Sequence, residues 1–280
     1  VIKFETVKAT AAGTLDLEDL KAKLNDDVIG VYFENPNYLG VIEPNGQAIS
    51  DAVHAAGGLS LVGVDPISLG VLSTPPTYGA DIVCGDLQPL GIHMYYGGGQ
   101  SGFMATTDDE KFVMEFPSRL FGIAPTSEPG EYGFGDVAYD RTSFGHHREH
   151  GKEYVGTQSA LWGITAGVYL ATMGPQGMAE VDELIMANAQ YAAKKLAEIP
   201  GVKVNPFGGA FFKEFVVDFT ATGKTVEEIN KALLAKGIFG GKDLSKDFPN
   251  LGQSALYCVT EVHMKEDLDT LAAAIAEVIK

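Results

Sequence analysis

Cysteine is scarce in this chain: only Cys84 and Cys258 occur among 280 residues. Each lies within an apolar run, and neither belongs to a C-x-x-C pair. No lysine or arginine lies near Cys84 in the sequence, although a catalytic thiolate needs a positive neighbourhood. We therefore expect two buried, reduced thiols in a cytoplasmic protein.

Positive charge is also in short supply, with 20 Lys and Arg against 37 Asp and Glu and a formal net charge of −17. Such an acidic surface repels phosphate backbones and anionic lipids, so nucleic acid and membranes are poor partners. The longest apolar segment, 161–174, is too short and too interrupted by glycine to span a bilayer. The first ten residues alternate charged and apolar side chains, unlike a signal peptide.

Several catalytic motifs are missing from the sequence. It has no G-x-S-x-G elbow and no P-loop lysine signature, which argues against hydrolases and nucleoside triphosphatases. Gly97, Gly99 and Gly102 match G-x-G-x-x-G, but a strand-like FMAT (103–106) follows instead of a helix. These glycines therefore favour a bend or a close backbone approach over dinucleotide binding. The segment GHHREH (145–150) lacks H-E-x-x-H spacing, which favours a polar loop over a metal site.

The first part of the chain alternates short apolar runs with helical patterns. A helix is expected over 46–58, where apolar residues recur at helical spacing and glycines end the pattern. Continuous apolar runs are typical of strands buried on both faces, and they occur at 28–33 (VIGVYF), 59–65 (LSLVGVD) and 80–86 (ADIVCGD). This alternation predicts an α/β fold with a mostly parallel sheet and functional groups at the carboxyl ends of its strands.

A second unit is expected toward the C-terminus. Residues 128–151 are rich in Gly, Tyr, Asp and His and are interpreted as a long loop, and two helices follow, the second over 178–199. Further strands are expected over 211–219 and 255–262, and helices after the capping box TVEE (225–228) and over 265–279. We predict a larger α/β domain over 1–160, connecting helices over 161–199 and a smaller α+β domain over 200–280.

Asp65 admits two interpretations. It ends a buried strand and precedes Pro66, a pattern typical of a helix N-cap followed by proline at the first helical position. A carboxylate at the carboxyl end of a strand can equally pair with the protonated ring nitrogen of a bound cofactor. The residues alone leave both interpretations open.

Several separated segments resemble the glycine cleavage P-protein family, and most closely its subunit 1, the alpha subunit of the two-subunit forms. The segments that carry the resemblance are VYFENPNYLGVIE (31–43), VGVDPISLGVLSTPPTYGADIVCGDLQPLG (62–91), GGGQSGFMAT (97–106) and CVTEVHMKEDLD (258–269). The resemblance is weakest over 128–157, where Arg148–Glu149 and Thr157 keep fragments of the family pattern. It implies the fold of the fold type I pyridoxal phosphate (PLP) enzymes, with a partial large domain and a small C-terminal domain. It also implies that this chain is an N-terminally truncated fragment.

The resemblance further implies how catalytic members hold PLP: a Schiff-base lysine, a carboxylate for the pyridine nitrogen and a phosphate cup. In those members the lysine follows a histidine just before the glycine-rich stretch, and the corresponding pair here is Gln88–Pro89. Proline cannot form an imine, and no lysine occurs between Lys23 and Lys111. Asp65 matches the carboxylate position as a vestigial partner of the pyridine nitrogen. The phosphate cup would lie upstream of residue 1.

We therefore expect a non-catalytic subunit of glycine dehydrogenase (decarboxylating) that binds no cofactor itself. The resemblance implies a heterotetramer whose lysine-bearing beta subunit (subunit 2) carries PLP, decarboxylates glycine and transfers the aminomethyl group to the lipoylated H-protein. The residues expected at the active-site or subunit interface are Gln88, His93, Tyr95, Gly97, Gly98, Gly99, Gly102, Arg141, Arg148 and Thr157. Each has a plainer explanation, such as bending for the glycines, packing for Tyr95 and solvated charge for the arginines.

Two other functions stay open at this point. The chain could be a stand-alone scaffold or binding protein with a degenerate PLP-enzyme fold, or a PLP-dependent lyase or aminotransferase whose lysine lies elsewhere. If the first part of the large domain is missing, an apolar sheet face must be covered by a second copy or a partner chain.

Overall fold

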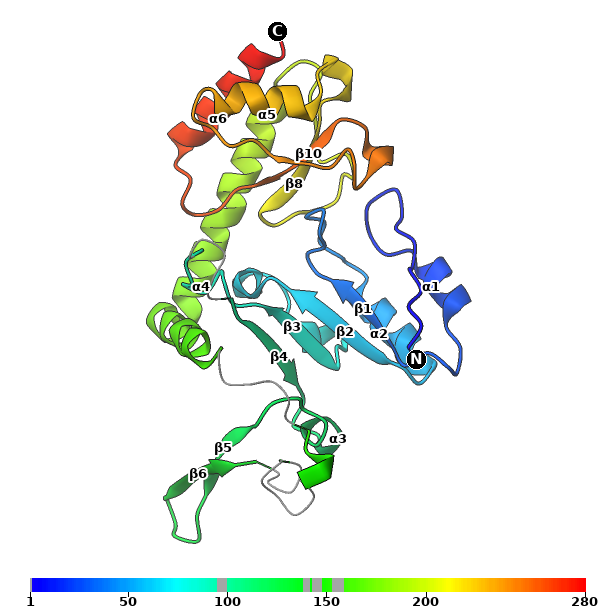
Figure 1. The fold of residues 1–280 in the computed structure, drawn as a ribbon, viewed down its shortest axis with the longest axis vertical. Coiled ribbons are helices and arrows are strands. Elements are labelled where there is room, and N and C mark those ends of the chain that lie inside the picture. Colours follow the sequence, from blue (N-terminus) through cyan, green and yellow to red (C-terminus); the bar gives the residue numbers. More distant parts are fainter. Residues whose placement is uncertain (1, 95–99, 138–141, 143–147, 153–158) are drawn as a thin grey trace.

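The computed structural model describes residues 2–94, 100–137, 142, 148–152 and 159–280 (Figure 1). In these ranges one four-stranded sheet comes from the first part of the chain and another from the last part. A long helix runs alongside both sheets, and a two-stranded hairpin projects at the end of the molecule away from the C-terminus (Figure 1).

The first sheet is mostly parallel, as the apolar runs predict. Its first three strands are parallel neighbours, and its fourth runs antiparallel to the third. In sheet order the strands are β1 (Gly30–Glu34), β2 (Leu59–Val64), β3 (Ile82–Asp86) and β4 (Gly102–Thr106). The carboxyl ends of β1, β2 and β3 therefore meet at one edge of the sheet, where α/β proteins place their ligands.

Two helices, α1 (Leu17–Lys23) and α2 (Gly46–Ala55), pack on one face of this sheet. The buried side chains between these helices and the sheet include Leu20, Ile49, Val53, Val62 and Val83. On the opposite face, the side chains remain more accessible: Tyr32 is 56% exposed and Met104 is 42% exposed. Because parallel strands are normally covered on both faces, this chain leaves one face of its first sheet open.

Helix α4 (Ala160–Ala197) connects the two sheets. Its backbone leaves the helical conformation at Gly174 (φ 62°, ψ 178°), immediately before Pro175, so two helical segments meet at a kink. The two successive helices predicted from the sequence are those segments. Helix α4 packs against η1 (Pro66–Gly70), which follows β2, and against elements of the second sheet region. None of the described helices, α4 included, has the length and apolarity needed to cross a membrane.

The second sheet is antiparallel, and its strands in order are β7 (Lys203–Val204), β8 (Glu214–Asp218), β10 (Ser254–Cys258) and β9 (Lys242–Asp243). Helices α4, α5 (Val226–Leu234) and α6 (Lys265–Val278) surround a core that includes Phe215, Val217, Ile229, Leu233 and Ile275. The predicted capping box is confirmed: Glu228 N donates to Thr225 Oγ1 at 3.2 Å, and Thr225 N donates to Glu228 Oε2 at 2.8 Å. The exact domain limits stay a prediction.

Strands β5 (Phe121–Pro125) and β6 (Tyr132–Asp136) form the projecting hairpin, which follows the short helix α3 (Glu110–Val113). The interpretation of 128–151 as loop is wrong for β6, because the alternating glycines of YGFGD have low strand propensity and hid the pattern. The register places every bulky apolar side chain on one hairpin face: Phe121, Ile123, Pro125, Tyr132 and Phe134. The other face carries Gly122, Ala124, Gly133 and Gly135.

Candidate functional site

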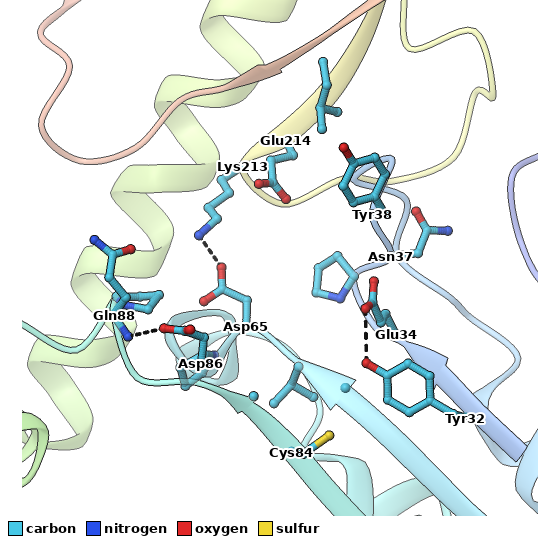
Figure 2. A pocket seen from close by; sticks show the side chains of 17 residues that line it. Tyr32, Glu34, Asn37, Tyr38, Asp65, Cys84, Asp86, Gln88, Lys213 and Glu214 are labelled. Carbon is cyan, nitrogen blue, oxygen red and sulfur yellow. Dashed lines mark hydrogen bonds and ion pairs between the residues drawn. The ribbon is translucent and has the colours of Figure 1, made fainter. Parts of the chain in front are cut away.

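A cavity of about 410 Å³ lies where the parallel strands of the first sheet end. Glu34 is the last residue of β1, Asp65 directly follows β2, and Asp86 is the last residue of β3. Lys213 and Glu214, at the start of β8, line the opposite wall, so the cavity lies between the two sheets (Figure 2). The predicted placement of functional groups at the carboxyl strand ends is the arrangement found around this cavity.

Asp65 uses its two carboxylate oxygens differently. Oδ1 accepts a hydrogen bond from Ile67 N at 3.2 Å and caps η1, in which Pro66 is the first residue, so the N-cap interpretation is confirmed. Oδ2 forms an ion pair with Lys213 Nζ, and both side chains are only 17% exposed (Figure 2). Both oxygens of the Asp65 carboxylate therefore already interact with groups of this chain.

Lys213 is a site residue that the sequence interpretation missed. Burial lowers the pKa of its amine, but the adjacent Asp65 carboxylate, with smaller contributions from Cys258 and Glu214, raises it by more. The net pKa lies above the ordinary lysine value, so Lys213 is an ammonium ion at neutral pH. The signal that could have identified it is a lysine–glutamate pair inside the otherwise apolar run FFKEFVVDF (211–219).

Acidic side chains surround this ammonium group. Burial raises the pKa of Glu214, and the Lys213 charge opposes that rise. Tyr32 donates a hydrogen bond to Glu34 Oε1 at 3.1 Å, and burial and the Glu34 charge both raise the pKa of the Tyr32 hydroxyl (Figure 2). The cavity lining holds four carboxylates, Glu34, Asp65, Asp86 and Glu214, against the single ammonium of Lys213.

Cys84 lies in the same lining, on β3. Burial raises the pKa of its thiol, and Glu34 adds to the rise, so the thiol is not activated. Both cysteines are free, but the expectation that both are buried is wrong: Cys84 is half-buried and Cys258 is exposed. Cys258 is the last residue of β10, where the strand leaves the core.

Gln88 and Pro89 line the cavity beyond β3, and Gln88 N donates to Asp86 Oδ1 at 2.6 Å (Figure 2). A second cavity of about 380 Å³ shares Gln88, Pro89 and Lys213 with the first one and is also lined by His93. The structure thus brings the predicted residues Asp65 and Gln88 together at the strand-end cavity and places His93 at the neighbouring cavity.

Gly102 begins β4 opposite Asp86, and a Cβ on Gly102 would lie 2.9 Å from Gly85 O. The interpretation of this glycine as a close backbone approach is confirmed. Arg148 begins the short 3-10 helix η5 (Arg148–His150), but its side chain lies outside the described residues. The other predicted interface residues, Tyr95, Gly97, Gly98, Gly99, Arg141 and Thr157, lie wholly outside them, as do His146 and His147.

The chain matches a known protein family over almost its whole length. The model of the family described as "Glycine cleavage system P-protein" matches residues 2–275. The chain belongs to this family. It is 39% identical over 267 residues to "Probable glycine dehydrogenase (decarboxylating) subunit 1" of Staphylothermus marinus, covering 95% of this chain and 56% of the relative. The protein of the same name from Pyrococcus furiosus is 40% identical over 274 residues, covering 98% of this chain and 59% of the relative.

Solved structures agree with this family assignment. A crystal structure of glycine decarboxylase (P-protein) of the glycine cleavage system, in inhibitor-bound form, matches with a TM-score of 0.86 and 34% identity, over 99% of this chain and 60% of that chain. A NifS-like protein from Rickettsia africae shares the fold at a TM-score of 0.67 and 15% identity, over 97% of this chain and 68% of that chain. The expected α/β fold of the fold type I PLP enzymes is confirmed. This P-protein chain spans little more than half the length of the relatives that it matches.

Proposed function

We propose that this chain is part of a non-catalytic subunit 1 of glycine dehydrogenase (decarboxylating). A lysine-bearing partner, subunit 2, binds PLP in this proposal, decarboxylates glycine and passes the aminomethyl group to the lipoyl arm of the H-protein. One observation supports this proposal most strongly. In this P-protein chain, Asp65 at the strand-end cavity forms an ion pair with Lys213 of the same chain.

Three features oppose PLP binding by the described residues of this chain. Asp65, the carboxylate expected to hold the pyridine nitrogen, is already paired with Lys213. Pro89 stands where the resemblance places the Schiff-base lysine, and proline has no amine to offer. Glu34, Asp86 and Glu214, which remain beside the neutralised Asp65–Lys213 pair, also repel a phosphate dianion. The donor set does not fit this cofactor.

Lys213 is poorly suited to replace the missing Schiff-base lysine. An imine forms from the neutral amine, whereas Asp65 and Glu214 keep Lys213 protonated. In a pyridine ring, the carbon that carries the aldehyde lies opposite the nitrogen, so a lysine held at the nitrogen's carboxylate is on the wrong side. Both arguments weigh against a self-sufficient lyase or aminotransferase.

Exposed apolar surface supports a partner for this chain. The bulky face of the β5–β6 hairpin is accessible, with exposed fractions of 56% for Phe121, 72% for Ile123, 70% for Tyr132 and 74% for Phe134. An isolated two-stranded hairpin is marginally stable, and contiguous exposed apolar surface marks interaction sites. The open face of the first sheet is a second such surface. We infer that the partner subunit, or the sequence that the relatives carry beyond the match, covers them.

In this proposal the chain performs no chemical step and supports the active site of the partner structurally. PLP bound in the partner supplies the electron sink for decarboxylation. Gln88 and His93, which follow β3, and Gly102, which begins β4, support the partner's active site from the side. The other predicted interface residues, Tyr95, Gly97, Gly98, Gly99, Arg141, Arg148 and Thr157, are proposed for the same interface.

Co-expression with a lysine-bearing subunit 2 tests the proposal. The two chains are expected to co-purify, and glycine-dependent release of CO₂ with lipoylated H-protein is expected only when both are present. Absence of a complex, with full activity of subunit 2 alone, would favour the scaffold function instead. A Gln88→Ala variant should leave the complex intact but lower its activity, and Asp26→Asn, at an exposed position away from the cavity and the hairpin, is the control for a surface change.

A further inference from the structure

The Lys213–Asp65 ion pair joins two sheets that are far apart in the chain. Asp65 follows β2 of the first sheet, and Lys213 precedes β8 of the second. Both side chains are 17% exposed, so water screens the pair only partly. Removing one partner of such a pair leaves the other charge buried and uncompensated.

The ion pair lies where a protein of this fold class could bind the ring of a cofactor. A carboxylate just beyond the end of a central parallel strand is well placed to hold a ligand's protonated nitrogen. Here a side chain of the same polypeptide supplies the cation, and the other carboxylate oxygen caps η1. A ring nitrogen could reach Asp65 only by displacing Lys213.

We propose that Lys213 is a built-in counter-ion that replaces a cofactor's ring nitrogen at Asp65, so that the pocket keeps its shape without a ligand and excludes PLP. Lys213 lines both this cavity and the neighbouring one. Glu34, Asp86 and Glu214 line the cavity beside the neutralised Asp65–Lys213 pair. Their negative charge disfavours the binding of an anion and favours the ammonium group of Lys213 at this position. The proposal concerns this chain alone and does not depend on which partner it has.

Binding measurements on the full chain, purified without a partner, give the first test. Pyridoxamine 5′-phosphate serves as the probe, because it has the pyridine ring and the phosphate but no aldehyde that would label surface lysines. No saturable change in probe fluorescence is expected with the wild-type chain. Saturable binding that Asp65→Asn abolishes would overturn the proposal.

Stability of paired variants gives the second test. Lys213→Met should lower Tm by roughly 6–10 °C, because Asp65 is left without its cation. Lys213→Arg should keep most of the wild-type Tm, and the neutral pair Asp65→Asn with Lys213→Met should regain most of the loss. If the single and double variants lose the same amount, Lys213 acts through packing of its apolar stem and the proposal is wrong.

Chemical rescue separates charge from packing. Lys213→Ala leaves space beside Asp65, and 1-methylpyridinium, a ring with a permanent positive charge, should raise its Tm. The same salt should have no such effect on the wild type or on Asp65→Asn with Lys213→Ala. Equal effects on all three chains would contradict the proposal. If the single variants do not fold, folding of the neutral double variants supports the counter-ion role, and their failure to fold opposes it.

Discussion

The carboxylate of Asp182 lies directly against Gly70, at the point where helix α4 crosses η1. A Cβ on Gly70 would overlap Asp182 Oδ2 and would lie 2.8 Å from Met178 O. Asp182 itself is fully buried. Helix α4 therefore packs directly against the segment that follows Asp65, and Asp65 and Pro66 line the strand-end cavity.

Gly70→Ala is expected to destabilise the chain by about 1–3 kcal/mol, because backbone and a buried carboxylate leave no room for the methyl group. Urea denaturation measures the change. The matched control is Gly167→Ala in α4, where nothing lies within 4 Å of the added atom. That substitution should stabilise the helix by up to about 1 kcal/mol. An unchanged free energy of unfolding for Gly70→Ala would contradict the described packing.

The stability of the chain is expected to depend on pH through Asp182. Burial raises the pKa of this carboxyl from 3.8 to about 7, the charges of Asp65 and Glu261 add to the rise, and Lys213 opposes it. Below about pH 4 the carboxyl is protonated in both the folded and unfolded states. Between about pH 4 and pH 7 the unfolded state loses the proton first, so stability falls as pH rises.

Asp182→Asn removes this loss. Between pH 4 and pH 8, the unfolding free energy of the variant relative to that of the wild type should rise by at most about 4 kcal/mol. The measurement is the difference in unfolding free energy between variant and wild type across that range. Asp26→Asn, at an exposed position, is the control. If the difference in unfolding free energy does not change with pH, the pKa of Asp182 is not raised in the folded state.

The hairpin face is expected to matter for assembly and not for folding. Phe121 and Phe134 stack with their ring centroids 5.6 Å apart, on the exposed apolar face. Phe134→Asp should change the stability of the isolated chain by less than about 1 kcal/mol, because the ring is 74% exposed. It should weaken binding to the partner subunit by roughly tenfold or more, as measured by sedimentation or calorimetry. The control is Asp26→Asn, at an exposed position outside the hairpin. Wild-type affinity for Phe134→Asp would show that the hairpin is not an interface.

Cys84 is expected to react slowly with iodoacetamide, in a Cys258→Ser background. Burial and the nearby Glu34 charge raise the pKa of its thiol, so at pH 7.5 the rate should be lower than that of free cysteine. Glu34→Gln should increase the rate, because it removes the negative charge. Reaction as fast as free cysteine would contradict the described surroundings of the thiol.

Local patterns in the sequence were sufficient for much of this fold. The apolar runs before Glu34, Asp65 and Asp86 are continuous, so the strands and their ends could be located without any tertiary information. The capping box at Thr225 and the Gly174–Pro175 interruption of the long helix are equally local signals. Strand β6 escaped prediction because its glycines contribute no propensity, and the hairpin is fixed by pairing with β5.

The candidate site could be predicted only in part. Asp65 was identified because it lies at the end of strand β2, and Gln88 because it lies in a segment that resembles the P-protein family. Lys213 was missed because its role depends on a contact with a residue far away in the chain, which no pattern around 211–219 records. Distance along the sequence, and not the chemistry of the residues, therefore limited what the sequence could reveal about the site.

The most direct test of the account is to locate the lysine that PLP modifies. The chain and its lysine-bearing partner are mixed with PLP, reduced with borohydride and digested, and the pyridoxyl-labelled peptides are mapped by mass spectrometry. A stoichiometric label is expected on a lysine of the partner subunit and none on Lys213. Stoichiometric label on Lys213, lost in the Lys213→Arg variant, would contradict it.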